Sequence, residues 1–411
     1  MHIRTMVAKR VMNSRKEETI SVIVETEDRK KFETSAPSGK SKGKYEVNDF
    51  SNKGLTFSID FVNVLGKKIA DERIVFETFD DLNKVEKIVR EYDKSSNLEL
   101  VGGNSLYALE CSLLKAMAHS YEVEPWKFLL RTNKINVPMP LGNAIGGGMH
   151  VKQDKKLDFQ EMLFIPKTDK FFDASFLNLQ AYKEAKRLLK EKDKKWKSKI
   201  TDENALATTL DNESTLKLMA QIRDDLRDKF KMKLEIGMDA ACSGFWNRIK
   251  YTYLNFSKEQ PVKNLGKAEQ LEYLDKLIKE NKLFYVEDPF YGDDFESFAK
   301  LLSKNKQTLI CGDDLICTNP DRLFEAIQKK SINSVIIKPN QVGSLLVAKE
   351  ALDMARKYDI VPIISHRSGE TNDNIIAHLA VGWNIPYIKT GITGEERLAK
   401  INELLRIERY C

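Results

Sequence analysis

Six polar side chains stand at the ends of six short apolar runs in the second part of the chain. The runs are the kind that form buried strands, bounded by polar or turn residues. Carboxylates, amines and imidazoles are the side chains that bind cations and move protons. These positions are therefore the first candidates for chemistry. In chain order they are Asp239, Glu287, Asp313, Lys338, His366 and Lys389.

Three of the six are carboxylic acids, and clustered carboxylates repel one another unless a cation neutralises them. Oxygen donors without cysteine suit a hard ion such as Mg²⁺. One acid at a strand end is usually a surface charge, but three at matching positions predict a metal site. A lysine beside a divalent cation loses its proton more readily. Lys338 or Lys389 could thus be a general base that takes a proton next to a carboxylate.

The spacing of the runs indicates the elements that must position these side chains. Successive polar ends are 23 to 48 residues apart, and a strand, a loop and a covering helix take about 30 residues. Helical patterns at residues 320–330 and 343–358 fill two of the gaps. Tandem βα units build a parallel sheet. In a closed barrel the carboxyl ends of such strands meet at one mouth.

Residues 134–411 are long enough for an eight-unit (β/α) barrel, which takes about 250 residues. An open doubly wound sheet is the alternative. It is disfavoured because no G-x-G-x-x-G follows a strand, and the glycines at 146–148 are followed by Met-His. We therefore expect an α/β fold class with a (β/α)8-type barrel over residues 134–411.

The first 133 residues do not show this regular spacing of apolar runs. Residues 19–26 alternate apolar and polar side chains and can pair with residues 31–35 across a turn. Helical patterns dominate residues 79–121 and are clearest at 105–120. Between them lies a loop of small residues, PSGKSKG at 37–43. We expect a smaller α+β domain over residues 1–133, with the boundary placed where Pro138 and Pro140 interrupt the pattern.

Composition excludes several classes of protein. The 411 residues are 42% hydrophobic and 31% charged, which is globular, and no run has the roughly 18 uncharged apolar residues of a membrane span. The net charge of +6 comes from 67 basic against 61 acidic residues. These are interleaved even in the densest basic run, residues 183–199, which indicates a solvated helix, so we expect no nucleic-acid partner. Five scattered cysteines predict free thiols and a cytoplasmic protein.

An ordered set of segments resembles enolase, the phosphopyruvate hydratase of glycolysis. The resemblance is dense from residue 284 to 406 and patchier before that. Residues 37–43 resemble the family's mobile lid loop, and Gln160 and Glu161 resemble one of its strands. The matching segments are NAIGGGMH at 143–150, EDPF at 287–290, GDDLICTNP at 312–320, KPNQVG at 338–343, SHRSGETN at 365–372, IKTG at 388–391 and ERLAKINELLRI at 396–407.

The resemblance implies a reversible dehydration of 2-phosphoglycerate to phosphoenolpyruvate that depends on two Mg²⁺ ions per chain. Asp239, Glu287 and Asp313 match the ligands of the first ion. Ser41 matches the lid serine that helps to bind the second ion once substrate is present. Lys338 matches the base that removes the C2 proton.

The resemblance also assigns the remaining site residues. Glu203 matches the acid that assists departure of the 3-hydroxyl, and Glu161 matches its neighbour. Lys389 matches the residue that contacts the substrate carboxylate. Gln160 is also expected to bind the substrate. Arg367 and Ser368 match the phosphate clamp, for which a bidentate guanidinium is well suited. Two histidines match those near the leaving hydroxyl and the phosphate, His150 and His366.

The family implies a barrel with one antiparallel strand and a homodimer or higher homo-oligomer. Two alternatives stay open: a catalytically weak or inactive enolase-like protein with a binding or structural role, and another superfamily member such as an acid-sugar dehydratase, which the Arg367–Ser368 pair disfavours. Asn204 and Ala205 follow Glu203 where the family has glycines, so we expect a stiffer loop there. His378, Arg397 and Lys400 are expected to be structural.

Overall fold

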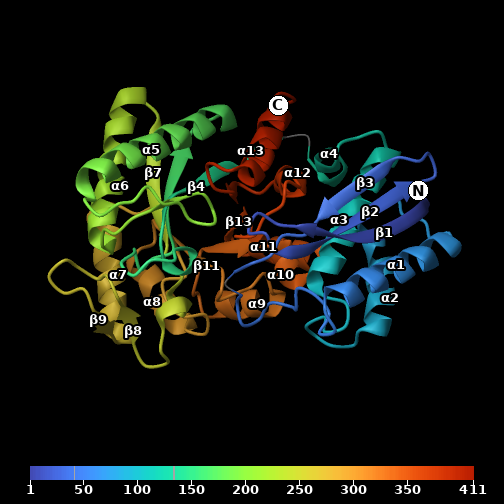
Figure 1. Cartoon of the computed structure of the whole chain (residues 1–411), viewed down its shortest axis with the longest axis horizontal. Coiled ribbons are helices and arrows are strands. Elements are labelled where there is room, and N and C mark those ends of the chain that lie inside the picture. The colour runs from blue at the N-terminus through green and yellow to red at the C-terminus, as the bar shows by residue number, and fades with distance from the viewer. Residues whose placement is uncertain (41, 133–134) are drawn as a thin grey trace.

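The structure is a computed structural model that describes residues 1–40, 42–132 and 135–411. In Figure 1 the amino-terminal region lies on the right and the barrel on the left, with the last helix between them at the top. The predicted boundary after residue 133 falls on residues outside the described ranges. It stays a prediction.

The amino-terminal part is a three-stranded antiparallel sheet with helices packed on it. The predicted pairing of residues 19–26 with 31–35 is confirmed, because Ser21 to Glu25 align with Ser35 to Lys31. Ile20, Val22 and Val24 are fully buried against the helices. The elements of this part are β1 (Ile3–Met12), β2 (Glu18–Thr26), β3 (Lys31–Ser35), α1 (Leu55–Asp71), α2 (Leu82–Tyr92), α3 (Gly103–Ser120) and α4 (Pro125–Leu129).

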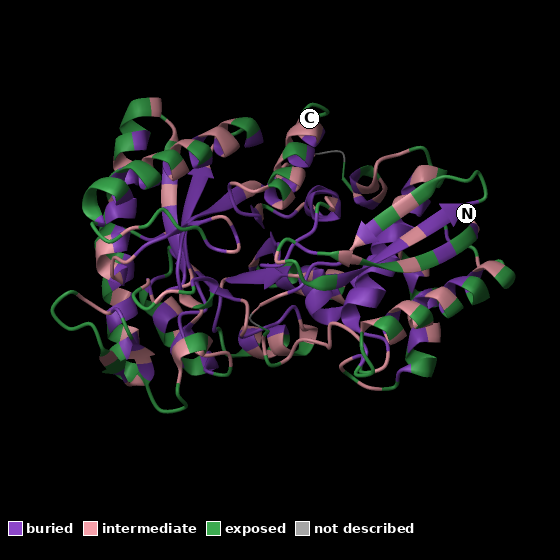
Figure 2. Ribbon diagram, in the orientation of Figure 1, coloured by how far each residue is buried: buried purple, intermediate pink, exposed green. Residues whose placement is uncertain are grey.

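The remaining part is a closed barrel of eight strands, as predicted. The last strand pairs with the first in parallel, which closes the sheet. Figure 2 shows these strands buried at the centre and the exposed residues on the helices around them. The barrel strands are β4 (Met139–Gly146), β5 (Glu161–Lys167), β7 (Lys233–Asp239), β10 (Tyr285–Glu287), β11 (Leu309–Gly312), β12 (Ser334–Ile337), β13 (Val361–Ser365) and β14 (Tyr387–Lys389).

The second barrel strand, β5, is antiparallel to both of its neighbours. It follows β4 after a connection without a long helix, and a parallel pair would need a crossover of a dozen or more residues, usually helical. Because β5 runs in the opposite direction, its first residue lies at the same edge of the barrel as the last residues of the parallel strands. Glu161 accordingly stands opposite Asp239 in the register.

Helices cover the barrel, and two predicted ones are found as α9 and α11. The basic run at 183–199 is, as expected, the end of a solvated helix, α5, and the loop after it. None of the described helices combines the length and the apolarity needed to cross a lipid bilayer. The remaining elements are α5 (Phe171–Lys192), β6 (Leu206–Ala207), α6 (Asn212–Phe230), β8 (Tyr251–Tyr253), β9 (Lys263–Leu265), α7 (Lys267–Asn281), α8 (Phe295–Lys304), α9 (Pro320–Gln328), α10 (Pro339–Val342), α11 (Leu345–Lys357), α12 (Ile375–Gly382) and α13 (Glu395–Glu408).

Candidate active site

The six predicted strand-end residues lie at one edge of the barrel. Asp239 and Glu287 are adjacent in the register of β7 and β10, and the others end or directly follow their strands. A cavity of about 200 Å³ opens at this edge. Glu287 is fully buried. Predicted site residues that line the cavity are His150, Gln160, Glu161, Glu203, Asp239, Asp313, Lys338, His366, Arg367, Ser368 and Lys389.

Lys389 is the centre of the charged cluster. Its ammonium lies 2.7 Å from a carboxylate oxygen of Glu287 and 3.1 Å from oxygens of Asp239 and Glu161. Burial opposes the charged form, but these three carboxylates raise the pKa of Lys389 well above its usual range. Burial, with the nearby Asp239, raises the pKa of Glu287 to about 7. The acids are therefore held together by a lysine in the free chain.

Lys338 has a different partner from Lys389. Its ammonium donates to a carboxylate oxygen of Asp313, whose other oxygen accepts from Gln341 at 3.0 Å. Burial disfavours the ammonium, but Asp313 outweighs this effect and raises the pKa of Lys338 above its ordinary value. In the free chain Lys338 is therefore charged. Lys338 can accept a proton only after it has lost its own. A change of charge beside Asp313 would lower the pKa of Lys338, which Asp313 raises in the free chain.

Glu203 lies between the two predicted histidines. Its carboxylate oxygens are 4.0 Å from Nε2 of His150 and 3.9 Å from Nε2 of His366, and one of them accepts from Asn143 at 3.0 Å. Burial raises the pKa of Glu203, but the charge of His150 and other nearby cations outweigh it and lower that pKa well below the usual range. Burial raises the pKa of Glu161 well above its usual range.

The predicted phosphate clamp is engaged by the amino-terminal domain. Arg367 is buried and its guanidinium lies 2.8 Å from a carboxylate oxygen of Glu46. The hydroxyl of Ser368 accepts from the backbone N–H of Lys40 at 2.9 Å and from Arg15 at 3.1 Å. In the free chain the guanidinium assigned to the phosphate is therefore paired with a carboxylate.

The donor set fits a hard divalent cation. Asp239, Glu287 and Asp313 offer carboxylate oxygens, and Oε1 of Glu287 is buried without a hydrogen-bond partner in the described part of the chain. Oxygen-only ligands suit Mg²⁺. Asp313 also lies within a compact group with Asp288 and Asp314 that could hold an ion. Burial and Asp313 raise the pKa of Asp314 to about 7.

The lid residue Ser41 lies outside the described residues, so its role stays a prediction. Its neighbour Lys40 donates to the backbone oxygen of Met149 at 2.7 Å and lies 3.7 Å from Asp202. Asp202 in turn lies 2.5 Å from Nδ1 of His150. The loop of small residues is therefore joined to the segment that carries Glu203.

Residues of this site that were not predicted from the sequence include Glu46, Asp202 and Asn143. Glu46 follows the lid loop and Asp202 directly precedes Glu203, so proximity to matched segments was the available signal. Asn143 begins the NAIGGGMH segment, but its contact with Glu203 depends on tertiary structure.

The loop after Glu203 is shaped by an asparagine in place of glycine. Asn204 has φ +61°, in the left-handed region, which asparagine tolerates better than most residues. Its side chain donates to Glu396 at 3.0 Å, and its carbonyl accepts from Tyr182 at 3.0 Å. The expected loss of backbone freedom is thus partly offset by a residue suited to that conformation.

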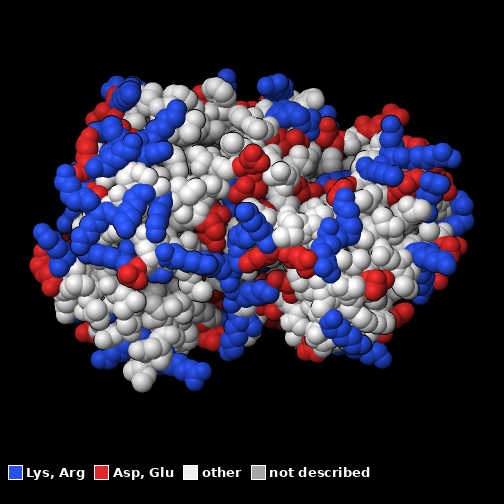
Figure 3. Space-filling view, in the orientation of Figure 1, with Lys and Arg blue, Asp and Glu red and all other residues white. Residues whose placement is uncertain are grey.

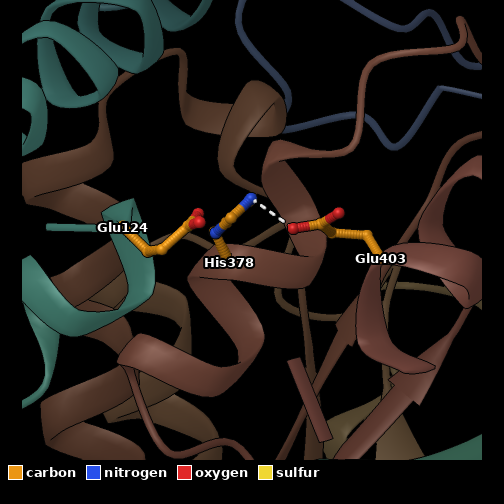
Figure 4. A group of neighbouring side chains, drawn as sticks. All are labelled: Glu124, His378 and Glu403. Atoms are coloured by element: carbon orange, nitrogen blue, oxygen red, sulfur yellow. Dashed lines mark ion pairs between the residues drawn. The ribbon is translucent and has the colours of Figure 1, made fainter. Parts of the chain in front are cut away.

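A second group of titratable side chains lies away from the cavity, where α4 meets α12 and α13. Figure 4 shows His378 between Glu124 and Glu403, and its Nε2 lies 3.0 Å from Glu403. Arg406 lies 2.9 Å from Glu124 and 2.6 Å from Glu403, so both carboxylates already have a cationic partner. The predicted structural role of His378 agrees with this partly buried ionic network.

The fold and the site together define a class. A closed β/α barrel with one antiparallel strand, capped by a small α+β domain and bearing acids and lysines at its mouth, is the architecture of the enolase superfamily. Sites in this superfamily use a lysine or histidine base with one or two Mg²⁺ ions.

Comparison with known proteins identifies the family within that class. The profile described as "Enolase, C-terminal TIM barrel domain" matches residues 134–410, and "Enolase, N-terminal domain" matches residues 3–129. The chain belongs to the enolase family.

Archaeal proteins named enolase are similar over nearly the whole chain. The protein from Methanosphaera stadtmanae is 39% identical over 376 residues, which cover 91% of this chain and 89% of the relative. The one from Methanothermobacter thermautotrophicus is 35% identical, with 99% of this chain and 96% of the relative covered. For Pyrobaculum aerophilum the identity is 34%, with coverage of 100% and 97%.

Proposed function

We propose that this chain is an active phosphopyruvate hydratase, which interconverts 2-phosphoglycerate and phosphoenolpyruvate in glycolysis and gluconeogenesis. One observation carries the proposal: the side chains matched to the family converge on a single cavity from eleven sequence positions. Folding of a barrel does not require them, because buried charges cost free energy unless they are paired.

In the proposed reaction, Lys338 takes the proton from C2 of the substrate. Mg²⁺ bound by Asp239, Glu287 and Asp313 would supply positive charge for a carboxylate that gains a second negative charge. Lys389, which lies among these acids, would contact the same carboxylate. Lys338 must first give up the proton that Asp313 stabilises in the free chain.

The leaving hydroxyl is assigned to the opposite side of the cavity. Glu203 would assist departure of the hydroxyl as the acid, with Glu161 as its neighbour. Arg367 and Ser368 would hold the phosphate. The guanidinium of Arg367 would then release Glu46 or bind Glu46 and the phosphate together. Gln160, whose side-chain nitrogen lies 3.4 Å from Asp239, would take part in binding the substrate.

We further propose two Mg²⁺ sites, the second formed with substrate and Ser41, and a homodimer or higher homo-oligomer. The donor chemistry of the mouth supports the first site. Five free cysteines, four of them buried, support a reducing, cytoplasmic location. Figure 3 shows acidic and basic side chains intermixed over the visible face, with Lys and Arg gathered over the barrel.

The direct test follows absorbance of phosphoenolpyruvate after purified chain is given 2-phosphoglycerate with Mg²⁺, and again with chelator. We expect a rise that the chelator abolishes. Lys338→Ala should remove it, because a lost acid–base group costs about 10²- to 10⁴-fold. Exposed Lys306→Ala is the matched control and should retain the rate.

Folding of each variant is checked by circular dichroism. A parent chain that is folded and binds Mg²⁺ but gives no absorbance rise would contradict the proposal and favour a non-catalytic, binding role. An unchanged rate in folded Lys338→Ala would remove Lys338 as the base.

A further inference from the structure

Arg397, in the first turn of α13, is fully buried and directed at the segment that carries three predicted site residues. Its Nη1 lies 3.0 Å from Nδ1 of His366 and donates to the backbone oxygen of Arg367 at 2.8 Å. Its Nη2 donates to the backbone oxygen of Ser368, also at 2.8 Å. A single guanidinium therefore contacts three consecutive residues of the cavity wall.

The contact with His366 determines where the imidazole carries its proton. A guanidinium has donors only, so Nδ1 must accept and cannot be protonated. The proton of the neutral ring then sits on Nε2. That atom is buried without a hydrogen-bond partner in the described part of the chain and lies 3.9 Å from Glu203. Because His366 lines the cavity, Nε2 is an unsatisfied donor available to a ligand.

We propose that Arg397 is a positioning residue that fixes His366 as the neutral Nε2–H tautomer and so presents a hydrogen-bond donor to an oxygen of the phosphorylated substrate. The inference rests on the proposed function for the identity of that substrate. The tautomer itself is a property of the free chain.

The charges that face His366 from each neighbouring element support a neutral ring. Arg397 faces it from α13, Lys389 from the end of β14 and Lys338 from the end of β12, while Glu203 is the facing acid. Burial disfavours the imidazolium, and Arg397 adds to this effect. Together they lower the pKa of His366 well below its usual range, although Glu203 acts in the opposite direction.

Lys400 provides a comparison on the same helix. It is also buried, and its ammonium lies 2.9 Å from Glu370 and donates to the backbone oxygen of Thr371. It thus supports the same 366–371 segment, and no hydrogen bond or ion pair among the described residues joins it to His366. A merely structural role would make variants of Arg397 and Lys400 behave alike, whereas control of the tautomer belongs to Arg397 alone.

The test is ¹⁵N NMR of the five histidines in the metal-free chain labelled with ¹⁵N-histidine, with His366→Gln used for assignment. We expect the parent to give a neutral His366 with Nδ1 unprotonated and Nε2 protonated from pH 5 to 8. In Arg397→Met the ring should lose this preference and titrate at a higher pH. In Lys400→Met it should keep the parent's tautomer and pH response.

Kinetics supply the second readout. Arg397→Met should lower kcat/KM for 2-phosphoglycerate by about 10²-fold, the scale of a misplaced catalytic group, and should move the acidic limb of the pH profile upward. Arg397→Lys should keep the positive charge but restore kcat/KM only in part, because one ammonium cannot reproduce the planar fork of donors that contacts residues 366–368.

The parent spectrum keeps the inference falsifiable even if Arg397→Met does not fold. A parent with the Nδ1–H tautomer, or a charged His366 at neutral pH, would overturn it whether or not the chain turns over. Equal tautomer shifts in the Arg397 and Lys400 variants would also overturn it. The expected tautomer in a chain without turnover would leave the inference standing and contradict only the proposed function.

Discussion

At the scale of single residues, the barrel mouth is a balance of buried opposite charges. Lys389 neutralises three acids and Lys338 a fourth, each at hydrogen-bond distance. Removing one member of such a set leaves its partners buried and unpaired. Substitutions here are therefore best made with side chains of the same shape, so that charge alone changes.

Glu287→Gln is the sharpest such substitution for the metal. The side chain keeps its size beside Lys389 but loses the charge that a divalent cation needs. We expect calorimetry to give a Kd for Mg²⁺ that is higher by about 10-fold or more, since even outer-shell partners contribute that much. Mg²⁺ should also raise the melting temperature of the parent more than that of the variant.

The matched control is Glu325→Gln, a half-exposed carboxylate on α9 that pairs with Lys329. It should leave both the affinity for Mg²⁺ and the stabilisation by Mg²⁺ unchanged. Equal affinity in Glu287→Gln and the parent would contradict the assignment of Glu287 as a ligand.

The positions of these residues could be predicted from the sequence, but their partners could not. Strand ends follow from the spacing of apolar runs, and this placed Asp239, Glu287 and Lys389 at one edge. Which amine binds which acid depends on rotamers and on segments far apart in the chain. Glu46 reaches Arg367 across 321 positions, a contact that no local pattern contains.

At the scale of elements, loops adapt to the conformations that the barrel imposes. The sequence predicted β2, β3, α9 and α11 because periodicity and turn residues are local signals. It predicted stiffness after Glu203 from the missing glycines. The structure places Asn204 in the left-handed region, a backbone property that residue type suggests but does not fix, and the stiffness of the loop stays a prediction.

Two substitutions at Asn204 separate backbone conformation from side-chain contact. Both Asn204→Gly and Asn204→Ala remove the hydrogen bond to Glu396. Only alanine resists φ +61°, at a cost of about 1–2 kcal/mol. We therefore expect the alanine variant to be less stable than the glycine variant by about that amount. It should also lose more activity, because the strained backbone at residue 204 is next to Glu203.

Urea unfolding and the hydratase assay on the pair measure this difference. Glycine is the matched control for alanine, since neither side chain can reach Glu396. An alanine variant at least as stable and as active as the glycine variant would show that the left-handed backbone at 204 is not a constraint on the loop.

At the scale of the whole molecule, an ionic network fastens the amino-terminal part to the barrel. Glu124, at the start of α4, binds Arg406 of α13, and Arg406 also binds Glu403. Glu403 pairs with His378 of α12 (Figure 4). The lid and Glu46 belong to the amino-terminal part and reach into the cavity. The network thus helps to hold the lid and Glu46 against the barrel residues of the site.

The network predicts a particular response to acid. Burial opposes ionisation of Glu403, but hydrogen bonds from His378 and Arg406 lower its pKa from 4.5 to about 2. A lowered carboxyl pKa stabilises the folded state above the unfolded value, and that contribution is lost as the pH falls from about 4.5 to 2. After allowance for solvent screening it amounts to about 1–2 kcal/mol at neutral pH.

Glu403→Gln should therefore lower the midpoint of urea unfolding at about pH 6, and the gap to the parent should narrow progressively as the solution is acidified below about pH 4.5. Glu280→Gln, at an exposed carboxylate on α7 that lies 4.0 Å from the ammonium of Lys276, is the control and should show little difference at either pH. Because the network joins α4 to α12 and α13, the effect should appear as earlier separation of the two parts. A gap that stays constant or widens in acid would mean that Glu403 does not act through its charge.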